Sequence, residues 1–60
     1  MRFVLQRSSD NQYYFEIQAS GNYETLATSE TYRDKLTAGT AIELIKSGAA
    51  DADVVDRTAA

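Results

Sequence analysis

The sequence predicts an α+β fold, a β-β-β-α-β unit in which an antiparallel meander has one helix packed on it. The first half of the chain alternates apolar and polar residues with a period of two, which is typical of half-buried strands. The second half carries one apolar stripe at helical spacing, and a Val-Val pair that favours extended structure follows it. Residues 1–60 are therefore expected to form a single domain.

Three segments alternate as strands do, and they span residues 2–7, 13–19 and 23–28. Phe3 and Leu5 share a face in the first. The second alternates most cleanly and places Phe15 and Ile17 on one face. The third is expected to turn Leu26 inward, on a face with few other apolar residues. The connections are short and rich in Ser, Asn, Asp and Gly, and connections of this length allow only antiparallel neighbours.

The chain then turns through a joint between the third strand and the helix, formed by Thr28, Ser29, Glu30 and Tyr32. Asp34 is the expected N-cap of the helix, and Gly48 is its expected C-terminal stop. The apolar stripe consists of Ala38, Ala41, Ile42, Ile45 and Ala49. Leu36 lies near the polar face of the helix, outside the apolar stripe, and is expected to contact a partner. Gly39 is expected to allow close packing of the helix on the sheet.

The tail of the chain combines extended propensity with negative charge. Val54 and Val55 favour a strand, while the flanking carboxylates are Asp51, Asp53 and Asp56. A short, acidic edge strand fits this composition. Because the helix covers one face of the meander, this strand must join an edge, either of its own sheet or of a neighbour's.

The amino-acid composition indicates that the chain associates with other chains. The chain has no Cys and no His, so it lacks disulfides and the usual ligands of zinc. It has two Phe, four Tyr and no Trp, which leaves few large apolar side chains for a core. Small chains without disulfides or metals commonly complete their core by binding another chain. We therefore expect the protein to oligomerise.

Charge and hydropathy limit the possible partners. The net charge is −3, which disfavours nucleic-acid and anionic membrane surfaces, since both require clustered Lys and Arg. No apolar run reaches the length of a membrane span. Gln6 and Arg7 interrupt the apolar run near the N-terminus, so no signal peptide is expected. A soluble, cytoplasmic protein is the expectation.

Several segments match a known pattern in order and spacing. Residues 22–32 read Asn-Tyr-Glu-Thr-Leu-Ala-Thr-Ser-Glu-Thr-Tyr, and Lys35, Ala41-Ile42-Glu43, Ile45-Lys46 and Val54-Val55-Asp56 follow. Together they resemble the YegP-like family of small bacterial and archaeal proteins, whose function is unknown. The resemblance covers essentially the whole chain. Two positions depart from the family pattern: Tyr23 replaces a turn Gly, and Ala41 replaces the Gly before Ile.

The resemblance implies an assembly. In the family, a β-β-β-α-β repeat occurs either twice in tandem or in two copies, and the C-terminal strands are exchanged between the halves. This chain holds one repeat. The resemblance therefore implies a homodimer in which the strand containing Val54 and Val55 is exchanged. It implies no activity.

Four groups of residues are candidates for chemistry, and we favour a structural role for each. Ser29 has no His to act as its base, so it is expected to bond to backbone in the joint. Tyr32 and Lys35 have the wrong spacing for a dehydrogenase pair, and no phosphate loop precedes them. The tail carboxylates lack the further ligands of a calcium loop. The strand aromatics lack adjacent cations for base stacking, although Tyr14 and Val4 are expected to form a patch on the open face.

The sequence thus predicts a non-enzymatic homodimer with no catalytic residue, metal or cofactor. We expect it to bind a protein or a small ligand on its open sheet face. The alternative is a nucleic-acid-associated protein, which the charge disfavours. An enzyme is disfavoured by the absence of His and Cys.

Overall fold

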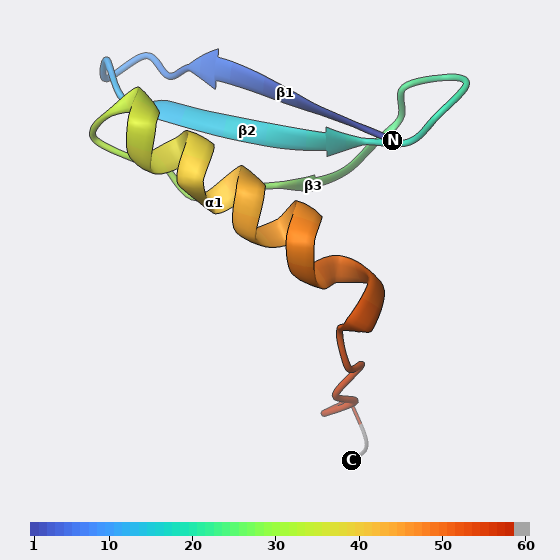
Figure 1. The fold of residues 1–60 in the computed structure, drawn as a ribbon. Coiled ribbons are helices and arrows are strands. Elements are labelled where there is room, and N and C mark those ends of the chain that lie inside the picture. The colour runs from blue at the N-terminus through green and yellow to red at the C-terminus, as the bar shows by residue number, and fades with distance from the viewer. Residues whose placement is uncertain (59–60) are drawn as a thin grey trace.

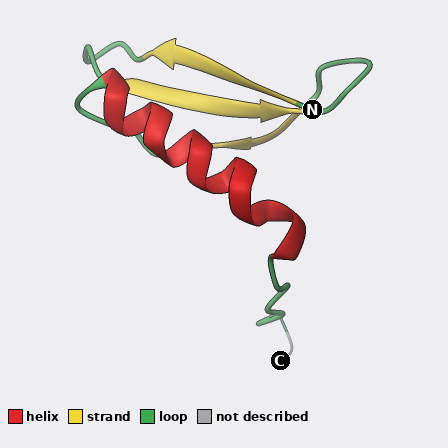
Figure 2. Cartoon of the chain, viewed as in Figure 1, coloured by secondary structure: helices red, strands yellow, loops and turns green. Residues whose placement is uncertain are grey.

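The computed structural model describes residues 1–58 as a three-stranded sheet with one helix across it (Figure 1). The elements are β1 (Arg2–Arg7), β2 (Tyr13–Gln18), β3 (Thr25–Thr28), α1 (Lys35–Gly48) and a 3-10 turn, η1 (Ala49–Asp51). The strand order is β1-β2-β3, and neighbouring strands are antiparallel. Figure 2 shows the two layers, with α1 on one face of the sheet. The predicted α+β class and the antiparallel meander are confirmed.

The register of β1 and β2 is regular and agrees with the predicted faces. Phe3 lies opposite Ile17, and Leu5 lies opposite Phe15. Directly opposed residues of an antiparallel pair project from the same face. These four apolar side chains therefore share one face, which is the face that α1 covers in part.

The third strand differs from the prediction in length and in orientation. Tyr23 has a φ of 57°, in the left-handed region that glycine favours, so it belongs to the turn and not to the strand. Ala27 lies opposite Ile17, and a register shift beside this pair is a bulge. Ala27 therefore shares the face of Ile17, and Leu26 does not; it is exposed. The expectation that Leu26 points inward is wrong, because the register with β2 places Ala27 opposite Ile17 and leaves its neighbour Leu26 for the other face.

The core contains a single large side chain. Among residues 1–58, only Phe15 and Ala38 are buried, at 2% and 0% exposure. The Phe15 ring lies 6.0 Å from the ring of Phe3 and stacks on Tyr32 at 6.2 Å, measured between centroids. In the rest of the predicted stripe, Ala49 is exposed, whereas the half-buried members are Ala41, Ile42 and Ile45. The helical stripe is confirmed over its first three turns.

The two ends of α1 are built differently. Asp34 is the N-cap, because its Oδ1 accepts hydrogen bonds from the Thr37 backbone N–H at 2.7 Å and from the Thr37 hydroxyl at 2.8 Å. These bonds, with the backbone one the larger cause, lower the pKa of Asp34 below 3.8. Gly48 is the last helical residue, with a φ of −113°, and the chain continues into η1. The expected glycine stop is therefore wrong.

Gly39 does not make the close contact that the sequence predicts. A Cβ atom built at Gly39 would meet nothing within 4 Å, so no neighbouring backbone requires a glycine there. The close approach between helix and sheet is at Ala38, which is fully buried.

The chain is more open than a compact monomer. After η1, residues 52–58 run away from the sheet and pair with no strand (Figure 1). Val54 is 95% exposed and Val55 69%. The radius of gyration is 13.3 Å, whereas about 10 Å is expected for 60 residues. The predicted fourth strand, at the C-terminus, is therefore not formed by residues 52–58 of the single chain, because α1 carries this segment away from both edges of its own sheet.

The solvent-accessible surface area also shows that the chain is more open than a compact monomer. It measures 4913 Å², whereas a compact monomer of 6.6 kDa exposes about 3,900 Å². The difference of about 1,000 Å² exceeds the roughly 800 Å² that one partner buries in a standard protein interface. One chain thus exposes enough extra surface for an interface.

We predict that the cap of α1 makes stability depend on pH. The pKa of Asp34 is lowered in the fold, so its contribution is present above about pH 4 and is lost as the pH falls through the folded pKa. Asp34→Ala should lower the free energy of unfolding at neutral pH. Asp34→Asn should preserve the cap, because Asn caps as well as Asp, but should weaken the acid dependence. Urea unfolding followed by circular dichroism, at one chain concentration and several pH values, measures both. An unchanged midpoint for Asp34→Ala at neutral pH would contradict the prediction.

Candidate functional site

An apolar groove lies between α1 and β1. It has a volume of about 660 Å³, and it is lined by Leu5 of β1 and by one side of the first turns of α1, namely Lys35, Leu36, Gly39, Thr40 and Glu43. Leu36 is 81% exposed within it. The sequence had left Leu36 without a contact in the chain, and the structure places it in the lining of the same groove as Leu5. We refer to this feature as the α1–β1 groove.

A smaller recess lies on the other side of α1. Its volume is about 290 Å³, and its apolar wall includes Ile17 of β2, Ala27 of β3 and Ile45 of α1. We refer to it as the α1–β3 recess. The helix thus covers β2 and leaves apolar surface uncovered on both sides, because its inward stripe is built largely from small Ala residues.

The joint between β3 and α1 is fastened to β2 by hydrogen bonds. The Ser29 hydroxyl accepts a bond from the Phe15 N–H at 2.9 Å and donates one to the Glu30 carbonyl at 2.7 Å. Tyr32 and Tyr13 exchange two backbone bonds, at 2.6 and 2.8 Å. The joint therefore holds the start of α1 against the edge of β2.

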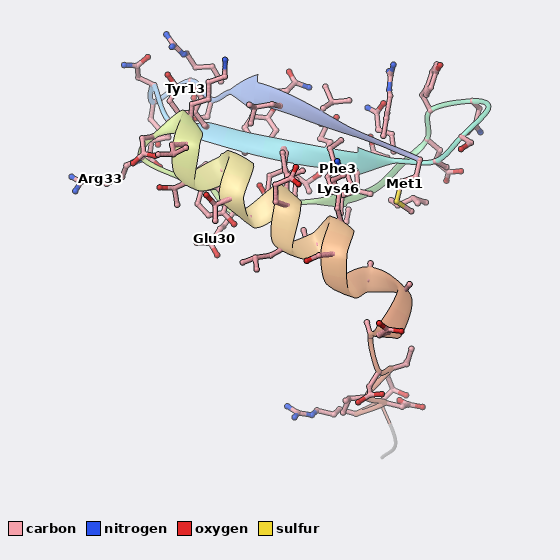
Figure 3. The ribbon with its side chains drawn as sticks, viewed as in Figure 1. Met1, Phe3, Tyr13, Glu30, Arg33 and Lys46 are labelled. Atoms are coloured by element: carbon pink, nitrogen blue, oxygen red, sulfur yellow. The ribbon has the colours of Figure 1, made fainter. Side chains whose placement is uncertain are left out.

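The other joint residues lie at the surface. Thr28 ends β3 and lies opposite Glu16. Glu30 is exposed, and Figure 3 shows Glu30 and Arg33 pointing outward from the segment that leads into α1. The ring of Tyr32 is half-buried by its stacking on Phe15. The hydroxyl of Ser29 is occupied by backbone partners, so nothing in this geometry activates it as a nucleophile.

The remaining candidates from the sequence are also placed. Lys35 is the first residue of α1 and lines the α1–β1 groove. Within residues 1–58, no three carboxylates lie close enough together to hold a metal ion. In the tail, Asp56 accepts bonds from the Thr58 hydroxyl at 2.6 Å and from its N–H at 2.9 Å. These bonds, the hydroxyl first, lower the pKa of Asp56, so it remains an anion at neutral pH.

The open face of the sheet carries a polar network that the sequence did not reveal. The Arg2 guanidinium lies 3.6 Å from the centroid of the Tyr23 ring. Its Nε donates to Gln18 Oε1 at 2.8 Å, and Gln18 Nε2 donates to Glu16 Oε1 at 3.2 Å. Tyr23 has a left-handed φ and precedes β3, so the alternation of the strands does not predict its contact with Arg2.

The expected apolar patch of Tyr14 and Val4 is diluted by polar neighbours. Val4 lies opposite Glu16, and Tyr14 lies opposite Gln6. Both apolar residues are half-buried. The open face is therefore a mixed surface of aromatic, amide and charged groups.

These features define the class of protein. It is a small α+β unit in which one helix covers only part of the apolar face of the sheet. No helix in the described part of the chain is long and apolar enough to cross a membrane. Comparison with known proteins identifies the family. DUF1508, a domain of unknown function, matches residues 8–56. The chain belongs to this family, whose relatives include the YegP proteins.

Three relatives differ in how much of their own length matches this chain. UPF0339 protein Atu0232 of Agrobacterium fabrum is 42% identical over 57 residues, which cover 95% of this chain and 90% of the relative. UPF0339 protein YegP of Escherichia coli K12 is 47% identical over 45 residues, which cover 75% of this chain and 40% of the relative. The match to YegP of Shigella flexneri has the same identity and coverage. The matched part is thus less than half of the YegP chain.

We predict that Ser29 contributes to stability. Ser29→Ala removes the acceptor of the half-buried Phe15 N–H, and an unsatisfied donor costs about 1–3 kcal/mol. Thr31→Ala is the matched control, because Thr31 is exposed in the same segment, and it should change stability by less than about 0.5 kcal/mol. Urea unfolding at one chain concentration compares the two variants. Equal stabilities would show that the bond to Phe15 does not hold the joint.

Proposed function

We propose that this protein is a non-enzymatic homodimeric module in which the tail of each chain, through Val54 and Val55, adds a strand to the sheet of its partner. The observation that carries the proposal is the incomplete core. Phe15 is the one large side chain buried among residues 1–58, while both tail valines are exposed. A domain of this size needs more apolar burial to fold alone, so a second chain is the natural source.

The relatives support this assembly. Because 45 matched residues make up only 40% of YegP, that chain is close to twice as long as this one. Atu0232, in contrast, is about as long as this chain. A chain of double length has room for two units, and a homodimer of this chain supplies the same two units on separate chains.

The proposed module binds a protein or a small ligand on its open sheet face, and a cytoplasmic location is part of the proposal. The face supports this role because it presents the stacked pair of Arg2 and Tyr23 together with the amide of Gln18. Aromatic rings and planar polar groups are typical of recognition surfaces. A non-enzymatic role is supported by the structural bonding of Ser29.

Binding of nucleic acid is the weaker candidate. Arg2 is held by Gln18, and Glu16 continues the same network, so the cation on this face has an anion nearby. The net charge of −3 opposes approach to a phosphate backbone.

We predict a dimer that depends on the tail. Sedimentation at micromolar chain concentration should give twice the mass of 6.6 kDa. Deleting residues 52–60 should yield a monomer with a lower unfolding midpoint, since the edge and the apolar surface would lose their cover. Val54→Ser with Val55→Ser keeps the chain length and should weaken the dimer in the same direction. A native protein that sediments as a stable monomer would disprove the assembly.

We also predict no binding to mixed-sequence oligonucleotides. Fluorescence anisotropy at low salt is the sensitive condition, because phosphate contacts are strongest there. An affinity that appears at low salt and falls steeply as salt is added would instead support the nucleic-acid alternative.

A further inference from the structure

A polar depression lies where the end of β1, the beginning of β2 and the first turn of α1 meet. It has a volume of about 360 Å³ and is lined by Leu5, Gln6, Arg7, Tyr13 and Lys35. Two of the six Lys and Arg side chains of the protein therefore share one depression, and none of the carboxylates in residues 1–58 lines it. We refer to it as the Arg7–Lys35 depression.

The depression is distinct from the open face of the sheet. Arg7 lies directly opposite Tyr13, and Leu5 lies opposite Phe15. Residues two apart in a strand project from the same face, so Arg7 and Tyr13 share the face of Leu5 and Phe15, which α1 covers in part. The depression is thus at the end of the helix-covered face, where Lys35 begins α1.

The donors of the depression are held in place before any ligand arrives. Arg7 Nη2 donates to the Tyr13 hydroxyl at 2.8 Å, and the guanidinium carbon lies 5.2 Å from the centroid of the Tyr13 ring. A guanidinium has five N–H groups, so most of those of Arg7 remain free. Because the Tyr13 hydroxyl accepts the bond from Arg7, its own proton is available to donate to a ligand.

The positive charge of the depression is not compensated by the chain. Within residues 1–58, neither Arg7 nor Lys35 forms an ion pair, whereas Lys46 pairs with Glu43 at 3.6 Å. Asp34 precedes Lys35, but its Oδ1 accepts bonds from Thr37 and its side chain does not line the depression. Although the net charge of the protein is −3, two unpaired cations in one concave site attract an anion.

We infer that the Arg7–Lys35 depression binds a phosphate group, carried by a small monoester or present as the free ion. A phosphate monoester carries close to two negative charges at neutral pH and has three strong acceptor oxygens. These match the two cations and the hydroxyl of Tyr13. The guanidinium fork of Arg7 suits two phosphate oxygens at once, and Lys35 supplies a point charge. A carboxylate has one charge and two oxygens, so it uses fewer of these groups.

The surroundings of the depression suit a small ligand. Sites for small molecules have volumes of about 300–1,000 Å³, and this depression is at the lower end of that range. Leu5 and Lys35 also line the α1–β1 groove, so an organic group attached to the phosphate would contact apolar surface there. The inference does not depend on the proposed homodimer, because Arg7, Tyr13 and Lys35 belong to one chain.

A nuclear magnetic resonance titration of the native, ¹⁵N-labelled protein tests the site. Phenyl phosphate is the probe, at low ionic strength and above the second pKa of the ester, which is about 6. The backbone amide signals of Arg7, Tyr13 and Lys35 should shift and saturate with one common Kd. Phenyl sulfate has the same shape with one negative charge fewer, and its Kd should be at least about threefold higher. Inorganic phosphate is the third ligand. An equal Kd for it assigns the free ion as the source, and a higher Kd assigns an ester.

Single-charge variants locate the binding. Arg7→Gln and Lys35→Gln should each raise the Kd for phenyl phosphate at least about fivefold, because each removes a charge-assisted hydrogen bond. Arg33→Gln is the matched control. It removes the same charge two residues before Lys35, and Arg33 points outward from the segment that leads into α1 (Figure 3). Its Kd should stay within about twofold of the native value. The amide spectrum of each variant also shows whether it is folded.

Three results would overturn the inference. The first is the absence of saturable shifts at Arg7, Tyr13 and Lys35 in the native protein. The second is an equal loss of binding in Arg33→Gln and Lys35→Gln, which indicates attraction by general charge. The third is an equal Kd for phenyl sulfate and phenyl phosphate, which indicates that the second charge of phosphate is not recognised. Each of these results leaves the proposed homodimer unaffected.

Discussion

The structure depends on how little apolar surface one chain is able to bury. The Phe15 ring lies between the rings of Phe3 and Tyr32 in the core of the sheet. Ala38 is the fully buried residue of the helix that covers this sheet. The small Ala residues of α1 allow close approach but add little buried area, since burial stabilises in proportion to the area removed from water. The result is a helix that covers the middle strand and leaves apolar surface on both sides of it.

The joint determines where that uncovered surface lies. Ser29 and Tyr32 tie the segment before α1 to β2, and the cap at Asp34 starts the helix directly afterwards. The direction of α1 is therefore set at its N-terminal end, and its C-terminal end extends past the sheet (Figure 1). The serine, glutamate and tyrosine that were candidates for chemistry thus belong to a structural joint. Because this joint fixes the start of the helix, it also determines that the tail leaves in a direction away from its own strands.

Membership of the DUF1508 family brings no activity with it, but the lengths of its members are informative. A unit with an incomplete core is compatible with two arrangements, a second unit on the same chain or a second copy of the chain. The second arrangement, unlike the first, depends on the concentration of the chain. The open sheet face, with its Arg2–Tyr23 pair and amide groups, is a surface separate from the α1–β1 groove.

The amino-acid sequence alone determined the order and type of the elements through β1, β2 and α1, because alternation and helical spacing are local properties of the chain. It also identified Asp34 as the cap and Phe15 as core. Local pattern failed where geometry is set by distant contacts: the register with β2 that turns Ala27 inward in place of Leu26, the open space around Gly39, and the stacking of Arg2 on Tyr23. Only the tertiary structure paired Leu36 with Leu5 in one groove, because which surface a helix leaves uncovered depends on where it crosses the sheet.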